Sequence, residues 1–182
     1  MVKESRKKVL VHYILLSFSI LLGILLDQWS KYLAVVHFKE KSAGTHVLIP
    51  KVLQLTYVEN RGAAWGVLQG KQTLFFLIGI LVLVLVFVIY RKIPYQRHYI
   101  PMRILAALLV MGAIGNMIDR IRQGYVVDFF EFTFISFPVF NVADIYVTVG
   151  SLLLIVFGLF FYKDEDLEFM KKADKNRADQ SE

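Results

Sequence analysis

Residues 74–90 read LFFLIGILVLVLVFVIY, a run of seventeen residues without a charged side chain. A helix that crosses the hydrocarbon core of a bilayer needs about 17–25 mostly apolar residues, so this run predicts a transmembrane helix. Three further apolar stretches lie at about 9–36, 104–119 and 144–162. The chain is 57% hydrophobic with a mean hydropathy of +0.55, which is more apolar than a soluble domain usually is. These features predict a membrane all-α fold with four transmembrane helices.

The first apolar stretch follows a basic cluster that includes Lys3 and Arg6, so it could be interpreted as a cleavable secretory signal. Two features disfavour this interpretation. The apolar run is longer than the roughly 7–15 residues of a signal's central region, and no small-residue cleavage site follows it. The run continues instead into Asp27, Gln28 and Lys31. We therefore predict that it forms the first span of the mature protein.

Basic residues crowd the N-terminus, the link between the second and third spans, and the segment after the fourth span. Cytoplasmic loops of membrane proteins are enriched in Lys and Arg, so both termini are predicted to be cytoplasmic. The net charge of +6 then suits anionic lipid headgroups, and no nucleic-acid partner is expected. We predict one domain over residues 1–163. A charged cytoplasmic tail, 164–182, is expected to fray or be disordered.

The link after the first span contains KVLQLTYVEN, in which Leu53, Leu55 and Tyr57 alternate with polar residues. This period of two predicts a strand with one buried face. Residues 125–140, YVVDFFEFTFISFPVF, are rich in aromatic rings, which concentrate at membrane interfaces. We therefore expect a small extracytoplasmic β-sheet, with a β region at about 45–66, and an interfacial segment seated on the external helix ends.

Several charged residues lie within or beside the predicted spans, although each costs roughly 2.5–3.5 kcal/mol on insertion scales. They are Asp27, Lys31, Asp119, Arg120, Asp128 and Asp144. Most are predicted to lie at external helix ends, at one level of the bilayer. Asp27 and Lys31 are four residues apart, and Asn116, Asp119 and Arg120 share a helix face. These groups could simply form ion pairs that lock the helices together.

Asp128 and Asp144 differ from the others, because neither has a basic residue nearby in the sequence. The structural interpretation makes Asp144 the N-cap of the fourth helix and Asp128 an interfacial carboxylate. The alternative is a catalytic pair, because two carboxyl groups about 3 Å apart share one proton. One group would activate water and the other would donate to the developing oxyanion. This chemistry needs no thiol, in agreement with the absence of cysteine.

Five motifs occur in order along the chain: DQWSK at 27–31, NRGAAWG at 60–66, GNMIDR at 115–120, VVDF at 126–129 and FNVAD at 140–144. Together they resemble the lipoprotein signal peptidase family, also called signal peptidase II. The resemblance extends from the first span to the fourth.

The resemblance implies an aspartic endopeptidase of the bacterial cytoplasmic membrane, with its active site near the outer leaflet. Such an enzyme removes signal peptides from diacylglyceryl-modified prolipoproteins by cutting before the lipid-modified cysteine. It implies Asp128 and Asp144 as the catalytic pair, without a metal or other cofactor. The residues expected to bind substrate or shape the site are Asp27, Lys31, Asn60, Gly62, Asn116, Asp119, Arg120 and Asn141. Expected partners are the lipid-modified prolipoproteins and membrane lipids, with a monomer as the working state.

Glycines in the NRGAAWG motif suggest how the substrate is approached. Gly62 and Gly66 are expected to let that loop come close to the lipid-modified peptide.

Two other classes of function compete with the peptidase. A proton or ion conductor would spread its acidic residues across the depth of the bilayer, whereas here they gather on one side. A non-catalytic lipid-binding or scaffold protein would tolerate carboxylate-to-amide changes at Asp128 and Asp144.

Overall fold

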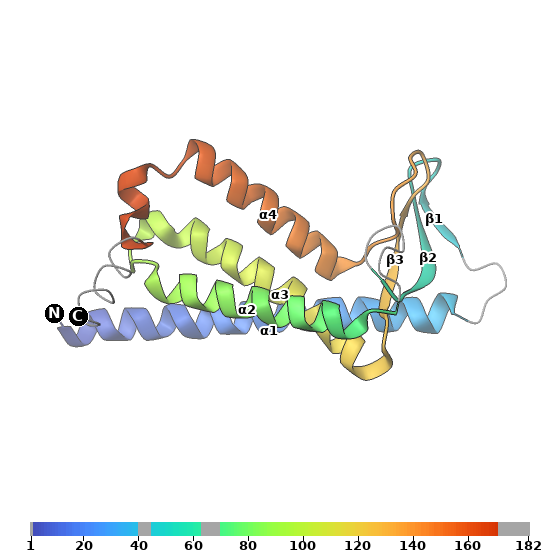
Figure 1. Cartoon of the computed structure of the whole chain (residues 1–182), viewed down its shortest axis with the longest axis horizontal. Helices are drawn as coiled ribbons and strands as arrows, with labels where there is room; N and C mark the ends of the chain where they lie inside the picture. The colour runs from blue at the N-terminus through green and yellow to red at the C-terminus, as the bar shows by residue number, and fades with distance from the viewer. Residues whose placement is uncertain (1, 40–44, 63–69, 171–182) are drawn as a thin grey trace.

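The computed structural model describes residues 2–39, 45–62 and 70–170, with side chains from Val9 onward. In this part of the chain, four long helices form a bundle and a three-stranded sheet lies at one end of it (Figure 1). The helices are α1 (Val2–Phe38), α2 (Gln72–Lys92), α3 (Ile100–Gln123) and α4 (Val142–Phe160). Each contains a stretch long and apolar enough to cross a membrane. The predicted membrane all-α fold is confirmed.

Helix α3 extends beyond the predicted span of 104–119 at both ends. Pro101 lies in its first turn, where the missing N–H removes no intrahelical hydrogen bond. Gly124 ends the helix in the left-handed conformation with φ 75°, and its N–H donates to the carbonyl oxygen of Arg120. Because the helix continues to Gln123, the polar residues of GNMIDR form its last turns and face the neighbouring elements.

The sheet contains β1 (His46–Ile49), β2 (Leu53–Asn60) and β3 (Val126–Phe132), paired antiparallel in that order. Strand β2 is the strand predicted from the alternation in KVLQLTYVEN, and β3 lies in the predicted aromatic segment. Val127 and Phe129 of β3 pack with Ala34 of α1 in one buried cluster. This contact seats the sheet on the last turns of α1, as predicted.

The register of β2 with β3 places an amide beside a carboxylate. Asn60 pairs with Val126, and Val58 pairs with Asp128. Asn60 and Asp128 are therefore diagonal neighbours, two residues apart across the strands, where side chains on one face come within reach of each other.

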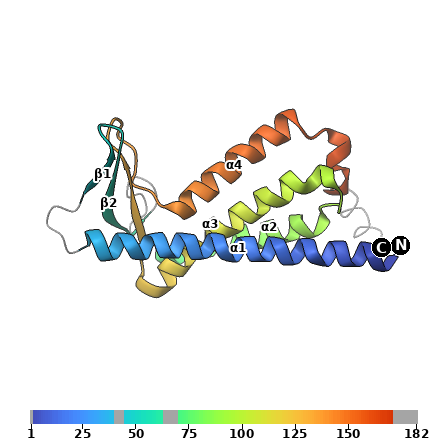
Figure 2. The ribbon, with the colours of Figure 1, turned by 180° about the vertical axis from the view of Figure 1, so that it is seen from behind.

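Helix α3 is the centre of the bundle, because it packs against each of the other three helices. Figures 1 and 2 show that α1 begins and α4 ends at the end of the bundle opposite the sheet. The start of α4, the end of α3 and β3 thus lie together, on the side of the bundle where the sheet is attached.

Close packing of α3 on α4 depends on glycine. A Cβ at Gly112 would lie 2.5 Å from the carbonyl oxygen of Ala143 and 2.5 Å from Cγ2 of Val147. Small residues allow such close backbone approach between membrane helices. We predict that Gly112→Ala destabilises the protein by about 1–3 kcal/mol, as overpacking of a tight interface does, read as a lower unfolding temperature (Tm) in detergent.

The matched control is Gly158→Ala in α4, because a Cβ there meets no atom within 4 Å. Alanine favours a helix over glycine, so this variant should keep or slightly raise the Tm. Equal losses in both variants would show that α3 and α4 are not packed as closely as described.

The start of the predicted tail is ordered, which corrects the expectation that it frays. Residues Asp164–Leu167 form a short 3₁₀ helix, η3. The hydroxyl of Tyr99 donates to the carbonyl oxygen of Asp166 at 3.0 Å, and His98 Nε2 lies 3.1 Å from Asp166 Oδ1. Leu167 and Phe169 pack against the buried cluster that contains Tyr99. These few apolar side chains hold the segment in place, whereas residues 171–182 lie outside the described residues.

Candidate active site

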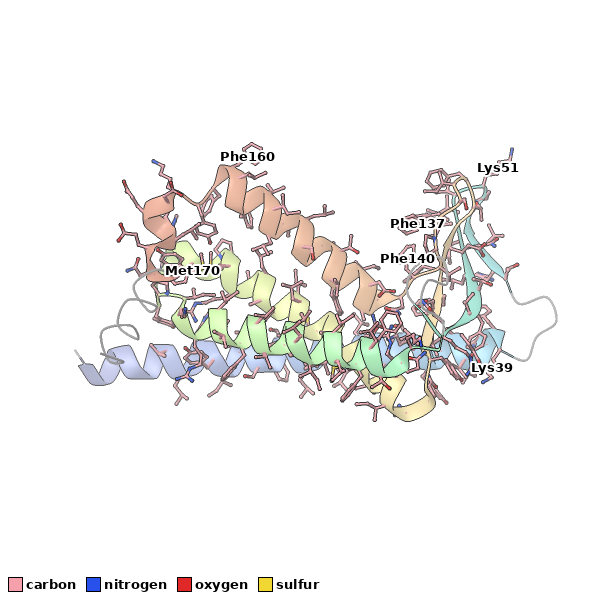
Figure 3. The ribbon with its side chains drawn as sticks, viewed as in Figure 1. Lys39, Lys51, Phe137, Phe140, Phe160 and Met170 are labelled. Atoms are coloured by element: carbon pink, nitrogen blue, oxygen red, sulfur yellow. The ribbon has the colours of Figure 1, made fainter. Side chains whose placement is uncertain are left out.

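Polar side chains from five elements meet where the sheet joins the bundle. Phe137 and Phe140 mark this region in Figure 3, between the sheet and the first turns of α4. The residues that meet here are Asp27, Gln28, Lys31, Asn60, Gly62, Asn116, Asp119, Arg120, Asp128, Asn141 and Asp144. The structure therefore brings together every residue that the sequence predicted for the site.

Lys31 is the centre of the charged part of this cluster. Its ammonium Nζ lies 2.9 Å from Asp27 Oδ2, 3.1 Å from Asp119 Oδ2 and 3.0 Å from Asn116 Oδ1. Three acceptors satisfy the three donors of the ammonium group. Lys31, Asp27 and Asp119 are all at most 4% exposed. The predicted pairing of Asp27 with Lys31 is confirmed, whereas Arg120 forms no ion pair within the described part of the chain.

The two carboxylates that Lys31 holds also fix the backbone around the site. Asp27 Oδ1 accepts a hydrogen bond of 2.8 Å from the N–H of Ala143, which ties α1 to the start of α4. Asp119 Oδ2 accepts one of 3.1 Å from the N–H of Val127, which ties α3 to β3. The charged cluster thus positions the two segments that carry Asp128 and Asp144.

Sequence reasoning missed the role of Gln28. Its Nε2 lies 3.1 Å from Asp27 Oδ2, 3.0 Å from Asp119 Oδ1 and 3.1 Å from the carbonyl oxygen of Gly115. The side chain therefore links α1 to α3 beside Lys31. The one available signal was its place within the DQWSK motif.

Asn141 begins α4 and reaches Asp144 through two hydrogen bonds. Its Oδ1 accepts from the N–H of Asp144 at 3.0 Å, and its own N–H donates to Asp144 Oδ2 at 3.1 Å. This reciprocal pair is a capping box. The N-cap is therefore Asn141, and the structural interpretation that made Asp144 the N-cap is wrong. Asp144 lies in the first turn, where the positive end of the helix dipole favours a carboxylate.

Neutral amides hold the Asp128 and Asp144 carboxyl groups. Asn141 Nδ2 donates to Asp128 Oδ1 at 2.7 Å, and Asn60 Nδ2 donates to Asp128 Oδ2 at 2.8 Å. Asn116 Nδ2 donates to Asp144 Oδ1 at 2.8 Å. Asn141 thus contacts both groups, one through its side chain and the other through its backbone. Within the described ranges neither carboxylate has an ion-pair partner, unlike Asp27 and Asp119.

Burial raises the pKa of Asp128 to about 7, and the negative charge of Asp144 contributes to the rise. Hydrogen bonds from Asn60 and Asn141 act in the opposite direction, because they favour the charged form. Asp128 is 1% exposed. A pKa near neutrality means that this carboxyl can carry a proton at physiological pH.

A groove of about 420 Å³ opens beside Asp144. Its polar lining includes Asn60, Asp144 and Arg120. Its apolar lining comes from the last residue of β3, the segment after it and one side of α4, and includes Phe132, Phe137, Phe140, Ile145 and Val149. A mostly apolar groove with a few convergent polar groups is typical of a ligand-binding site.

Arg120 lines this groove and carries a donor without a partner among the described residues. Its guanidinium lies over the ring of Phe75 at 5.0 Å, and NH1 makes a long contact of 3.4 Å to the carbonyl oxygen of Asn116. Its buried Nε has no hydrogen-bond partner in the described part of the chain. Buried donors are normally satisfied, so this unpaired Nε beside the groove is unusual.

Gly62 lines the same groove, and its N–H donates to Asn60 Oδ1 at 2.9 Å. This bond orients the Asn60 amide toward Asp128. Gly66 and Trp65 of the same motif lie outside the described residues. Among the residues described, no group of three or more histidines and carboxylates could hold a metal ion.

Comparison with known proteins gives consistent results. A family model described as signal peptidase (SPase) II matches residues 19–160. The lipoprotein signal peptidase of Enterococcus faecalis is 42% identical over 151 residues, 82% of this chain and 89% of that protein. That of Caldanaerobacter subterraneus is 48% identical over 134 residues, 72% of this chain and 86% of that protein. A solved bacterial membrane enzyme matches with a TM-score of 0.67 at 36% identity, covering 82% of this chain and 93% of that one.

The membrane-spanning bundle, the carboxyl groups of Asp128 and Asp144 at one end of it, and these relatives together define a multi-pass membrane peptidase. The chain belongs to the signal peptidase II family. The resemblance found in its five motifs is thereby confirmed.

Proposed function

We propose that the protein removes signal peptides from diacylglyceryl-modified prolipoproteins, with Asp128 and Asp144 as its catalytic pair. The observation that carries the proposal is the position of Asn141, which donates hydrogen bonds to the buried Asp128 carboxyl and to the partly buried Asp144 carboxyl beside an open groove. Two carboxyl groups that repel each other, one buried and one partly buried, and that have no ion-pair partner among the described residues are suited to acid–base chemistry near neutral pH.

The reaction follows from this arrangement. One carboxylate takes a proton from water as the water oxygen bonds to the scissile carbonyl carbon, and the other carboxyl donates its proton to the carbonyl oxygen. In the resulting tetrahedral intermediate, the first group gives its proton to the leaving nitrogen, and the second group, now ionised, takes a proton from one of the two hydroxyls as the C–N bond breaks. The products are a new carboxyl terminus and an amine, and the pair again holds one proton. Asn60 and Asn116 hold Asp128 and Asp144 in place through both changes of charge.

The groove supports a peptide substrate attached to lipid. Ile145 and Val149 lie on a partly exposed face of α4, along which an apolar signal helix can pack. Phe137 and Phe140 line the same groove and offer an aromatic wall suited to acyl chains. The guanidinium of Arg120, which lines the same groove, would donate a hydrogen bond to a peptide carbonyl.

The orientation of the chain supports a site at the outer leaflet of the bacterial cytoplasmic membrane, with both termini cytoplasmic. The end of α2, the start of α3 and the link between them lie at the end of the bundle away from the sheet (Figure 1). These segments carry the basic residues Arg91, Lys92, Arg97 and Arg103, which is typical of cytoplasmic segments. The carboxyl pair at the other end then lies at the level of the outer leaflet, where the bond between a signal helix and its lipid-modified cysteine is located. Water can reach this level from outside the cell.

The substrate class can be tested with purified protein in detergent. A synthetic prolipoprotein peptide carrying a diacylglyceryl cysteine should be cut immediately before that cysteine, as mass spectrometry of the products would show. The same peptide with an unmodified cysteine should remain intact, because it lacks the acyl chains that the aromatic wall binds. Equal cleavage of both peptides would contradict the proposed substrate class.

Activity should depend on pH through the shared proton. The raised pKa of Asp128, about 7, means that its carboxyl loses its proton as the pH rises through this value. Both groups are then ionised and neither can donate to the substrate, so kcat/KM should fall about tenfold per pH unit well above pH 7. The measurement is kcat/KM from about pH 6 to about pH 9. A constant value across this range would contradict a shared proton.

A further inference from the structure

A second groove lies in the half of the bundle away from Asp128 and Asp144. It has a volume of about 720 Å³ and is lined by α1, α2 and α3. Helices α1 and α2 each pack against α3 but make hardly any contact with each other in the described part of the chain. Ala106 and Ala107 on α3 fill little of the space between them. The volume lies within the roughly 300–1,000 Å³ typical of small-molecule sites.

The lining divides into an apolar channel and a polar mouth. The channel includes Leu16, Ile20, Leu83 and Val110, which lie toward the middle of the spans. The mouth, at the end of α2 opposite the sheet, carries Tyr13, Tyr90 and Arg91. Tyrosine and arginine at the end of an apolar channel are typical of the interface between acyl chains and headgroups.

Charge at the mouth favours an anion. Arg91 contacts the ring of Phe87 at 5.7 Å and forms no ion pair with any described residue. Between Glu59 and Asp119 the sequence has no acidic residue, although several basic ones lie near the end of α2. Of these, Arg103 is already engaged with backbone carbonyl oxygens. Among the residues described, Arg91 is thus a cation of this mouth that no carboxylate neutralises.

We propose that this groove binds one phospholipid of the cytoplasmic leaflet, with an acyl chain along the apolar channel and an anionic headgroup at Arg91. The occupant fills the space that α1 and α2 leave open, and so stabilises the bundle. The assignment of the lipid to the cytoplasmic leaflet depends on the proposed orientation of the chain. The lipid site itself does not depend on the roles proposed for Asp128 and Asp144.

The probe is phosphatidylglycerol added to delipidated protein, compared with phosphatidylcholine of the same acyl chains. Native mass spectrometry should show a one-to-one complex with a preference for phosphatidylglycerol of about fivefold, as one basic residue at a membrane surface provides. Arg91→Gln should remove the preference. Arg122→Gln, an exposed residue at the other end of α3, should keep it.

A second variant separates a defined site from general lipid contact. Ser17 lines the groove and is exposed, so Ser17→Phe fills the channel without burying a new side chain in the core. It should abolish the one-to-one complex, whereas Ser19→Phe, exposed on the same helix but outside the groove lining, should not.

Three outcomes would overturn the proposal: equal binding of the two lipids, a complex that persists in Ser17→Phe, or a protein dimer that Ser17→Phe dissociates. Because binding is measured without cleavage, absence of peptidase activity would leave this result unaffected.

Discussion

Replacing Asp144 with Asn should leave the protein folded in the membrane while lowering kcat for the lipid-modified peptide by at least roughly 10²–10⁴-fold. An amide cannot take a proton from water or return one to the leaving nitrogen. Its oxygen can still accept from the N–H of Asn141, so the capping box keeps its backbone hydrogen bond. The fold should therefore survive a change that removes the chemistry.

Asp128→Asn should have the same effect on kcat, because the two carboxyl groups act as one unit. For the same reason the double variant should be hardly slower than either single one, since residues that act together are strongly non-additive. The control is Asp164→Asn, which removes an exposed carboxylate after α4, far from the site. Retained cleavage in either Asp128→Asn or Asp144→Asn would refute the catalytic pair.

The second large effect is expected on stability, from Lys31→Met. Asp27 and Asp119 are both buried, and Lys31 is the cation that contacts them. Removing one partner of a buried ion pair costs about 3–5 kcal/mol, because the remaining charge is uncompensated. For a chain of this size, such a loss lowers the Tm by roughly 6–20 °C. The measurement is thermal unfolding of the purified variant in detergent.

Lys39→Met provides the matched control, because Lys39 follows the same helix and also pairs with a carboxylate, Glu59, at 3.2 Å. Its side chain is 43% exposed, so solvent screens the pair and the Tm should change little. Adding Asp119→Asn to Lys31→Met should recover part of the lost stability by removing one uncompensated charge. Equal losses in Lys31→Met and Lys39→Met would show that the buried cluster is not held by its charges.

The buried cluster also connects stability with activity. Lys31 and Asn141 both donate to Asn116 Oδ1, and this leaves the Asn116 amide group directed at Asp144. Without Lys31, one of these two donors is lost. We therefore expect Lys31→Met to lower kcat at temperatures where the variant is still folded.

The sequence alone determined the spans, the strand at Leu53–Asn60 and the family. These features are local: a run such as 74–90 must cross the bilayer wherever its neighbours lie, and alternation in KVLQLTYVEN exposes one face of a strand in any partner sheet. The ends of α3 were less predictable. Polar residues such as Asn116 and Asp119 lower its hydropathy, and the groups that compensate them come from other elements.

Only the tertiary structure decided which polar groups meet. It paired Asp119 with Lys31 rather than with the adjacent Arg120, made Asn141 the cap of α4, and joined Asp27 to the N–H of Ala143, 116 residues away. The physical reason is that hydrogen bonds and ion pairs act over about 3 Å in space. Spacing along a helix shows which side chains share a face, whereas the packing of α1, α3, β3 and α4 determines what that face contacts.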